Sequence, residues 1–117
     1  MSPNNLVIVR GIVRAEATTR ELASGDTVCQ FDVRVERADG GGAADVPVSW
    51  FGAPTAPNAG EPVVVVGEVR RRFYRVGGAT RASTDVLATH VVAQRRRARV
   101  ARVVDEAIDQ IQFSQRP

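Results

Sequence analysis

The sequence predicts a mainly β fold, a five-stranded barrel followed by a C-terminal amphipathic α-helix. Two observations support this prediction. Between residues 5 and 93, short runs rich in Val and Ile alternate with Gly, Pro and Asn residues of the kind found in turns. After residue 94, apolar residues recur every three or four positions, as on one face of a helix. We therefore expect one domain over residues 1–93, and a basic helix with a short tail over residues 94–117.

Five strands are expected, at residues 6–13, 29–36, 45–51, 63–74 and 81–93. The second and third alternate apolar and polar residues, which is typical of strands with one buried face.

Single residues refine these strands. Gly11, inside the first strand, indicates a bulge or a bend of the barrel. In the third strand the alternation places Trp50 inward and sends Phe51 to the polar face. Residues 52–62 contain three prolines and predict a loop instead of a regular helix. Residues 76–78, Val-Gly-Gly, predict the hairpin turn between the last two strands.

Charge points to a polyanionic partner only if the cations gather on one surface. The chain has 117 residues, with 16 basic residues, all of them arginine, against 13 acids and a formal net charge of +3. Arginine can replace lysine throughout a protein because of GC-rich coding. The positions of the arginines therefore carry the argument, and their number does not.

The sequence shows no catalytic apparatus. With one cysteine, Cys29, and one histidine, His90, neither an intramolecular disulfide nor a Cys/His zinc site can form. No nucleophile and base stand in a recognisable motif, so we expect no enzyme activity, no cofactor and no metal. Neither a signal peptide nor a transmembrane run is visible, so a cytoplasmic protein that does not enter a membrane is expected.

The fourth strand contains the most informative stretch. Arg70, Arg72 and Tyr74 share one face, and Arg71 and Phe73 share the other. Proteins that bind single-stranded nucleic acids pair such groups, because cations follow the phosphates while rings stack on bases. The alternative is a solvated strand face whose arginines only protect an edge from aggregation.

Phe51 favours the binding interpretation, because a large ring on a polar face indicates a partner. Its alternative is a bulge that turns the ring back into the core. Arg75 continues the basic stretch, and Arg34 extends the face unless it is an ordinary solvated charge.

The expected helix, at about residues 95–112, begins with Arg95, Arg96 and Arg97 and has its acids near its end. This order opposes the helix dipole, so the arginines are expected to serve phosphate contact or the acidic surface of a partner protein. The apolar stripe is expected to pack on its own barrel or on a neighbouring subunit.

Two motifs carry a resemblance to a known family. Ser-Trp-Phe-Gly at residues 49–52 and Gly-Glu-Val-Arg-Arg-Arg at residues 67–72 resemble bacterial single-stranded DNA-binding proteins, over about residues 5–93. The resemblance implies an OB-fold barrel, single-stranded DNA as partner, a tetramer or dimer, and roles in DNA replication and repair. It also implies stacking by Phe51 and Tyr74 beside Arg70 and Arg72.

The departures from the family predict a short paralogue. Ala38 and Asp45 stand where the family has stacking tryptophans, a Pro-rich loop replaces a helix, and the acidic C-terminal tail is missing. We therefore expect non-catalytic, sequence-independent binding of single-stranded DNA by a homo-oligomer. The alternative is an OB-fold interaction module that docks a partner protein through its C-terminal helix. The candidate DNA-binding residues are Phe51, Arg70, Arg72, Tyr74, Arg34, Arg75, Arg95, Arg96 and Arg97.

Overall fold

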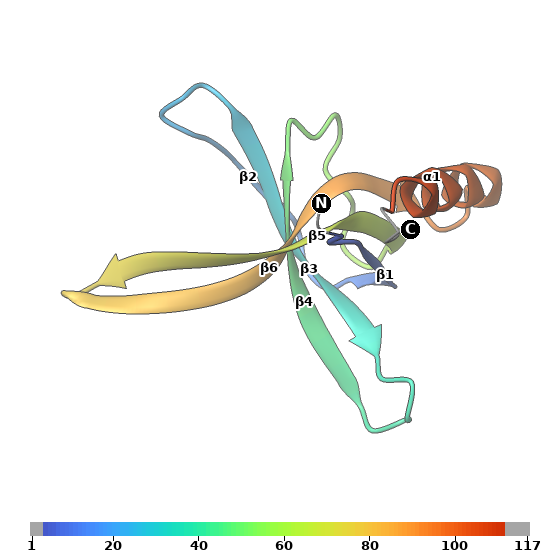
Figure 1. Cartoon of the computed structure of the whole chain (residues 1–117), viewed down its shortest axis with the longest axis horizontal. Coiled ribbons are helices and arrows are strands. Elements are labelled where there is room, and N and C mark those ends of the chain that lie inside the picture. The colour runs from blue at the N-terminus through green and yellow to red at the C-terminus, as the bar shows by residue number, and fades with distance from the viewer. Residues whose placement is uncertain (1–3, 112–117) are drawn as a thin grey trace, which may run out of the picture.

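Six strands and one helix make up residues 4–111, the part of the chain that the computed structural model describes (Figure 1). They are β1 (Val7–Val13), β2 (Thr18–Glu21), β3 (Thr27–Glu36), β4 (Ala43–Phe51), β5 (Pro62–Val76), β6 (Ala79–Ala93) and α1 (Arg97–Asp109).

Five of the strands close into a barrel in the order β1-β5-β6-β4-β3, and a short pairing of β1 with β3 completes it. Neighbouring strands run antiparallel except β4 and β6, which are parallel. The predicted five-stranded barrel is confirmed. The additional strand β2 was not expected, because its sequence, Thr-Thr-Arg-Glu, is polar and fully exposed and has no hydrophobic alternation. It forms by extending the sheet along the backbone of β3.

Two glycines permit the close approach of strands that the barrel requires. A Cβ atom on Gly11 would lie 2.2 Å from the Arg34 carbonyl oxygen, at the point where β1 passes from β5 to β3. A Cβ on Gly67 would lie 2.2 Å from the Leu87 carbonyl oxygen, beside a register shift between Val66 and Gly67. Gly11 thus marks the closure of the barrel, and the bulge lies in β6, where Thr89 is the extra residue opposite Val66 and Gly67.

The core comes from the inward residues of the alternating strands. Phe31, Val33, Val48, Val65 and Val86 are buried in one cluster, and Cys29 lies in it as a small apolar side chain. Trp50 is half-buried and packs against this cluster, as its inward position predicted.

Helix α1 packs on its own barrel, which decides between the two positions expected for its apolar stripe. Val103, 4% exposed, forms a second cluster with Val66 of β5 and Val92 of β6. The helix begins at Arg97, so Arg95 and Arg96 precede it, and it ends at Asp109, short of the expected residue 112. No helix within residues 4–111 is long and apolar enough to cross a membrane.

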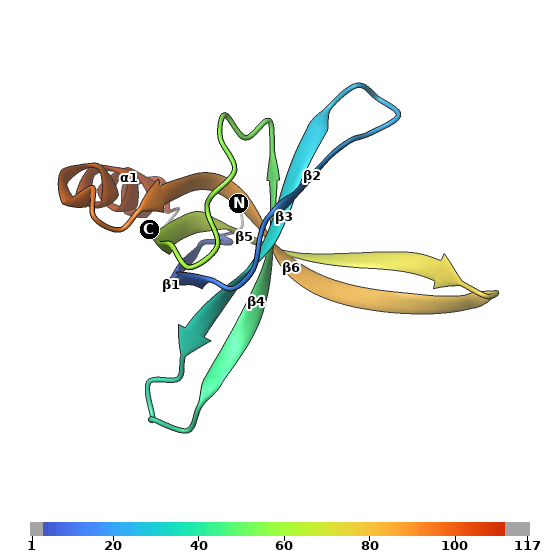
Figure 2. The same cartoon turned by 180° about the vertical axis from the view of Figure 1, so that it is seen from behind.

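The hairpin of β5 and β6 projects from the barrel on the side opposite α1 (Figures 1 and 2). Its turn has two residues, Gly77 and Gly78, with φ of 57° and 83°. Both values are positive, as the common two-residue hairpin turn requires.

Candidate nucleic-acid interface

The strand registers bring the predicted aromatic and basic residues of β4 and β5 onto one surface. Pairing of β5 with β6 sets Arg70, Arg72 and Tyr74 opposite Asp85, Ser83 and Arg81. Beside them, the parallel pairing of β4 with β6 continues this surface, here called the outer face, onto β4 and β3. Its members are Gln30, Ser49, Phe51, Arg70, Arg72, Tyr74, Arg81, Ser83 and Asp85.

Two aromatic rings lie open on the outer face. Phe51 is 41% exposed and Tyr74 is 48% exposed. No bulge returns Phe51 to the core, and the guanidinium carbon of Arg70 lies 5.8 Å from the centre of its ring. This is a cation–π contact that leaves part of the ring accessible.

Arg70 is held by a buried carboxylate. Its Nε and Nη2 donate hydrogen bonds to the two carboxylate oxygens of Asp85, at 3.1 and 2.8 Å. The hydroxyl of Ser49 donates to the same carboxylate at 2.8 Å, and Arg72 lies 4.0 Å from it. Asp85 is only 6% exposed. This paired carboxylate therefore anchors the centre of the outer face.

The charge of Asp85 is maintained by these neighbours. Burial alone would raise the pKa of its carboxyl group, but the hydrogen bonds from Arg70 and Ser49 and the charges of Arg70 and Arg72 outweigh it, and the pKa lies below 3.8. Asp85 therefore neutralises part of the positive charge of the outer face.

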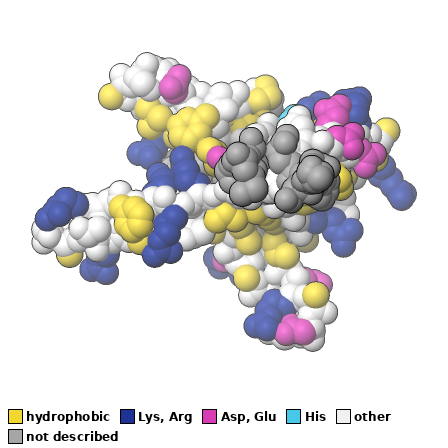
Figure 3. Space-filling model, viewed as in Figure 1, with side chains coloured by type: hydrophobic (Ala, Val, Ile, Leu, Met, Phe, Trp, Pro, Cys, Tyr) yellow, Lys and Arg dark blue, Asp and Glu magenta, His cyan; other side chains and the backbone are white. Residues whose placement is uncertain are grey.

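Arg72 and Tyr74 line a hollow of about 360 Å³, together with Ser49 and Asp85. In Figure 3 basic and hydrophobic side chains lie along the projecting hairpin, and further basic side chains lie where the hairpin meets the barrel. The surface combines cations, an open ring and a concave floor.

Arg34 and Arg75 are placed less favourably for contact with a ligand on the outer face, because each already has a partner within the protein. Arg34 lies on β3 and forms an ion pair of 3.2 Å with Asp45, which also pairs with Arg14 at 2.7 Å. Arg75 points toward the hairpin turn, where its Nη2 donates to the carbonyl oxygen of Gly78 at 2.8 Å.

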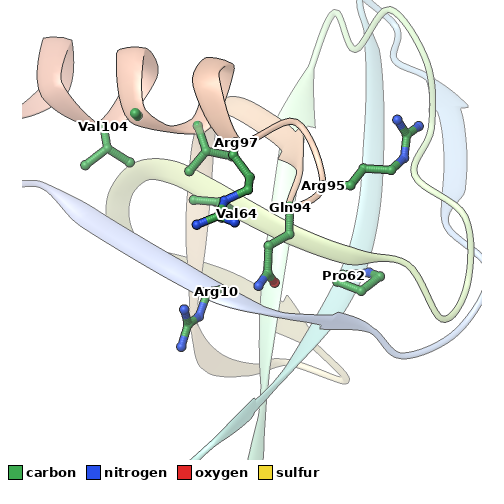
Figure 4. A pocket seen from close by; sticks show the side chains of 9 residues that line it. Arg10, Pro62, Val64, Gln94, Arg95, Arg97 and Val104 are labelled. Atoms are coloured by element: carbon green, nitrogen blue, oxygen red, sulfur yellow. The ribbon is translucent and has the colours of Figure 1, made fainter.

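The structure does not bring Arg95, Arg96 and Arg97 to the outer face. They lie at the start of α1, on the side of the barrel opposite the hairpin (Figures 1 and 2). Within residues 4–111 none of the three forms an ion pair. Arg97, Arg95 and Arg10 line a groove of about 640 Å³ between α1 and the barrel (Figure 4). The rest of its lining is mainly aliphatic, from Pro62, Val64, Val100, Ala101 and Val104.

Other residues with chemical potential are not grouped into a site. Cys29 is 1% exposed, and the Nδ1 atom of half-buried His90 lies 3.2 Å from the hydroxyl of Thr89. Across residues 4–111 no three His, Cys, Asp or Glu side chains lie close enough together to hold a metal ion.

Comparison with known proteins identifies the fold. No protein-family profile and no curated protein matches the sequence. The chain is similar to the dimeric structure of the N-terminal domain of PriB protein from Thermoanaerobacter tencongensis, with a TM-score of 0.61 and 18% sequence identity. The match covers 78% of this chain and 97% of that chain. The barrel is an OB fold. Because one fold hosts many functions, this similarity shows the architecture and not the activity.

Sequence reasoning missed the network of Asp85, Ser49 and Arg70. A signal for part of it was present. A two-residue turn at Gly77 and Gly78 fixes the register of the hairpin, and counting back from it sets Arg70 opposite Asp85. The contribution of Ser49 depends on the parallel pairing of β4 and β6, which no local pattern announces.

Proposed function

We propose that this protein binds single-stranded DNA through the outer face of its OB fold, without catalysis and without sequence preference, as a cytoplasmic homo-oligomer. The observation that supports the proposal is the exposure of Phe51 and Tyr74 on the same face as Arg70 and Arg72. In OB folds the face of the second and third barrel strands and the neighbouring loops bind oligonucleotides. Those barrel strands are β3 and β4 here, and the β5–β6 hairpin borders them.

The contacts of each side chain on the outer face support a separate role for it in the proposal. Phe51 and Tyr74 stack on bases, which needs no particular base because every base has a flat face. Arg72, whose side chain is 43% exposed and 4.0 Å from Asp85, meets phosphate. Arg70, held by Asp85 and lying over Phe51, serves mainly to orient that ring. We keep Arg34 and Arg75 as peripheral phosphate contacts in the proposal.

The proposed assembly agrees with the fold comparison, since the similar PriB domain is a dimer. Membership of the single-stranded DNA-binding protein family, and roles in replication and repair, stay predictions from the two sequence motifs.

Titration with a labelled oligothymidylate, followed by fluorescence anisotropy at two salt concentrations, tests the proposal. Phe51→Ala and Tyr74→Ala should each weaken binding by about 1 to 3 kcal/mol, the cost of losing one stacking ring. Both rings are exposed, so the melting temperature should change little. Ile108→Ala, which removes a 44% exposed side chain of α1, serves as the control and should bind like the unaltered protein. If binding is absent at low salt, or is equal in all variants, the proposal is wrong.

A second candidate function is docking of a partner protein beside the C-terminal helix. The observation that favours it is the groove along α1, which is lined mainly by aliphatic residues together with Arg10, Arg95 and Arg97 (Figure 4). Its described lining contains no aromatic ring on which a base could stack. An acidic peptide with a large apolar side chain fits this chemistry better than DNA.

A further inference from the structure

The β5–β6 hairpin has a second exposed aromatic face, on the side opposite Tyr74. Alternation along β5 places Val69, Arg71, Phe73 and Arg75 on this side, here called the inner hairpin face. Val69 pairs with Val86 of the barrel core, so the inner hairpin face continues the surface that lines the barrel interior.

Beyond the barrel no other element within residues 4–111 covers this face. Phe73 is 68% exposed, and the residue opposite it on β6 is the small Ala82. Val69 is 46% exposed. An open ring of this size loses the stabilisation that burial would give, which indicates a ligand or a partner.

The inner hairpin face repeats the pairing of cation and ring seen on the outer face. The guanidinium carbon of Arg71 lies 5.6 Å from the centre of the Phe73 ring, just as that of Arg70 lies 5.8 Å from the centre of Phe51. Unlike Arg70, Arg71 has no carboxylate partner in the described part of the chain, and its Nη1 lies 3.5 Å from the hydroxyl of Thr84. Its charge is available to an anion.

Charge decides between the possible occupants. The acids of the hairpin strands, Glu68 and Asp85, both lie on the outer side, whereas Arg71 and Arg75 lie on the inner side. A second copy of the hairpin would set arginines against arginines. A chain that carries phosphates and flat bases matches both the charge and the ring.

The projecting part of the hairpin has no neighbouring strand among those of residues 4–111, so a ligand can pass round it from one face to the other. The side chain of Asn5 forms two hydrogen bonds of 2.9 Å with the backbone of Val69, where the pairing of β1 with β5 has ended. The pairing of β4 with β6 stops at Val86. The remainder of the hairpin projects freely (Figures 1 and 2).

We infer that the inner hairpin face is a second stacking platform for the same DNA strand, which passes round the hairpin from Tyr74 to Phe73. This inference rests on the proposed function. It predicts that a short oligonucleotide occupies the outer face alone, and that a longer one engages Phe73 and Arg71 as well.

The test compares oligothymidylates of about 8 and about 30 nucleotides, because site sizes of OB folds span about 4 to 16 nucleotides. Phe73→Ala should weaken binding of the longer oligonucleotide by about fivefold to a hundredfold, the range for one stacked base, and leave the shorter one unaffected. Phe73→Tyr should retain the affinity, because it keeps the ring. Ile108→Ala, a truncation of a 44% exposed side chain on α1 and outside both hairpin faces, is the control and should have little effect.

Photocrosslinking of a 30-nucleotide oligothymidylate that contains 5-iodouracil provides an independent readout. We expect crosslinked peptides that contain Phe73, identified by mass spectrometry.

Equal affinities of Phe73→Ala and the unaltered protein for the longer oligonucleotide would overturn the inference, while loss of binding in Phe51→Ala and Tyr74→Ala would leave the proposed function standing. A lower mass of Phe73→Ala in light scattering would instead assign the face to subunit contact. Absence of any DNA binding would overturn both proposals.

Discussion

A buried carboxylate, Asp85, lies beneath the arginines of the outer face. Asp85→Asn removes its charge while keeping its shape. We expect the free energy of unfolding to fall by about 2 kcal/mol, the scale of hydrogen bonds to charged groups. Asp45→Asn is the control, since Asp45 also pairs with two arginines but their side chains are about half exposed. Ion pairs of that kind contribute about 0 to 1 kcal/mol, so urea unfolding should separate the two variants.

Asp85→Asn should weaken the fold but increase the contribution of charge to DNA binding. Once Asp85 is uncharged, Arg70 and Arg72 are free to meet phosphates. The dependence of log affinity on log salt should steepen by up to about 0.7 for each additional phosphate that these arginines bind. A weaker affinity with an unchanged salt dependence would show instead that Asp85 is needed to hold Arg70 over Phe51.

The lowered pKa of Asp85 also predicts that the stability of the fold depends on pH. Its pKa is lower in the folded protein than the ordinary value of 3.8, so the carboxylate stabilises the fold at pH values above 3.8. This contribution is complete above about pH 5 and disappears as the pH falls through the lower, folded pKa. Urea unfolding of the unaltered protein and of Asp85→Asn should differ most at neutral pH and converge near about pH 2. A difference that stays constant with pH would contradict this role.

At the scale of elements, α1 and the barrel share a small core of their own. Val103→Ala removes two methyl groups from a site that is 4% exposed, between Val66 and Val92. We expect the free energy of unfolding to fall by about 2 kcal/mol, from lost burial and the cavity left behind. Ile108→Ala, on an exposed side of the same helix, should cost much less. Because the stripe packs on its own barrel, light scattering should give the same mass for Val103→Ala, and a lower mass would place this helix between subunits.

At the scale of the molecule, the arginines at the start of α1 and the outer face lie on opposite sides of the barrel. Replacing Arg95, Arg96, Arg97, Arg99 and Arg102 with Gln removes the charge and keeps good helix formers. We expect unchanged affinity for an oligothymidylate of about 8 nucleotides, which is within the span of one OB-fold site, and weaker affinity for one long enough to reach α1. Anisotropy measures both. If affinity for both lengths is unchanged and a labelled peptide of alternating Glu and Leu loses its binding, the groove belongs to a partner protein.

Local patterns in the sequence determined the strands, their inward faces and the hairpin turn. Because side chains alternate along a strand, Phe31 and Val33 share one face of β3, and that apolar face is the buried one. The two consecutive glycines, Gly77 and Gly78, favour a two-residue hairpin turn. The same alternation separated Phe51 from Trp50 and Tyr74 from Phe73, because it depends only on backbone geometry. The sequence pattern did not predict strand β2, because its polar residues are held by backbone pairing with β3 and not by a buried apolar face.

Only the tertiary structure decided which distant residues meet. The parallel pairing of β4 with β6 carries Ser49 to Asp85, and barrel closure separates the arginines of α1 from the outer face. It also decided that α1 covers its own barrel, and that the hairpin extends beyond the core with both faces open. The physical reason is that strand pairing across the barrel and the packing of α1 join segments far apart in the chain. The spacing of residues along the sequence determines which face each side chain takes, and it does not determine what lies against that face.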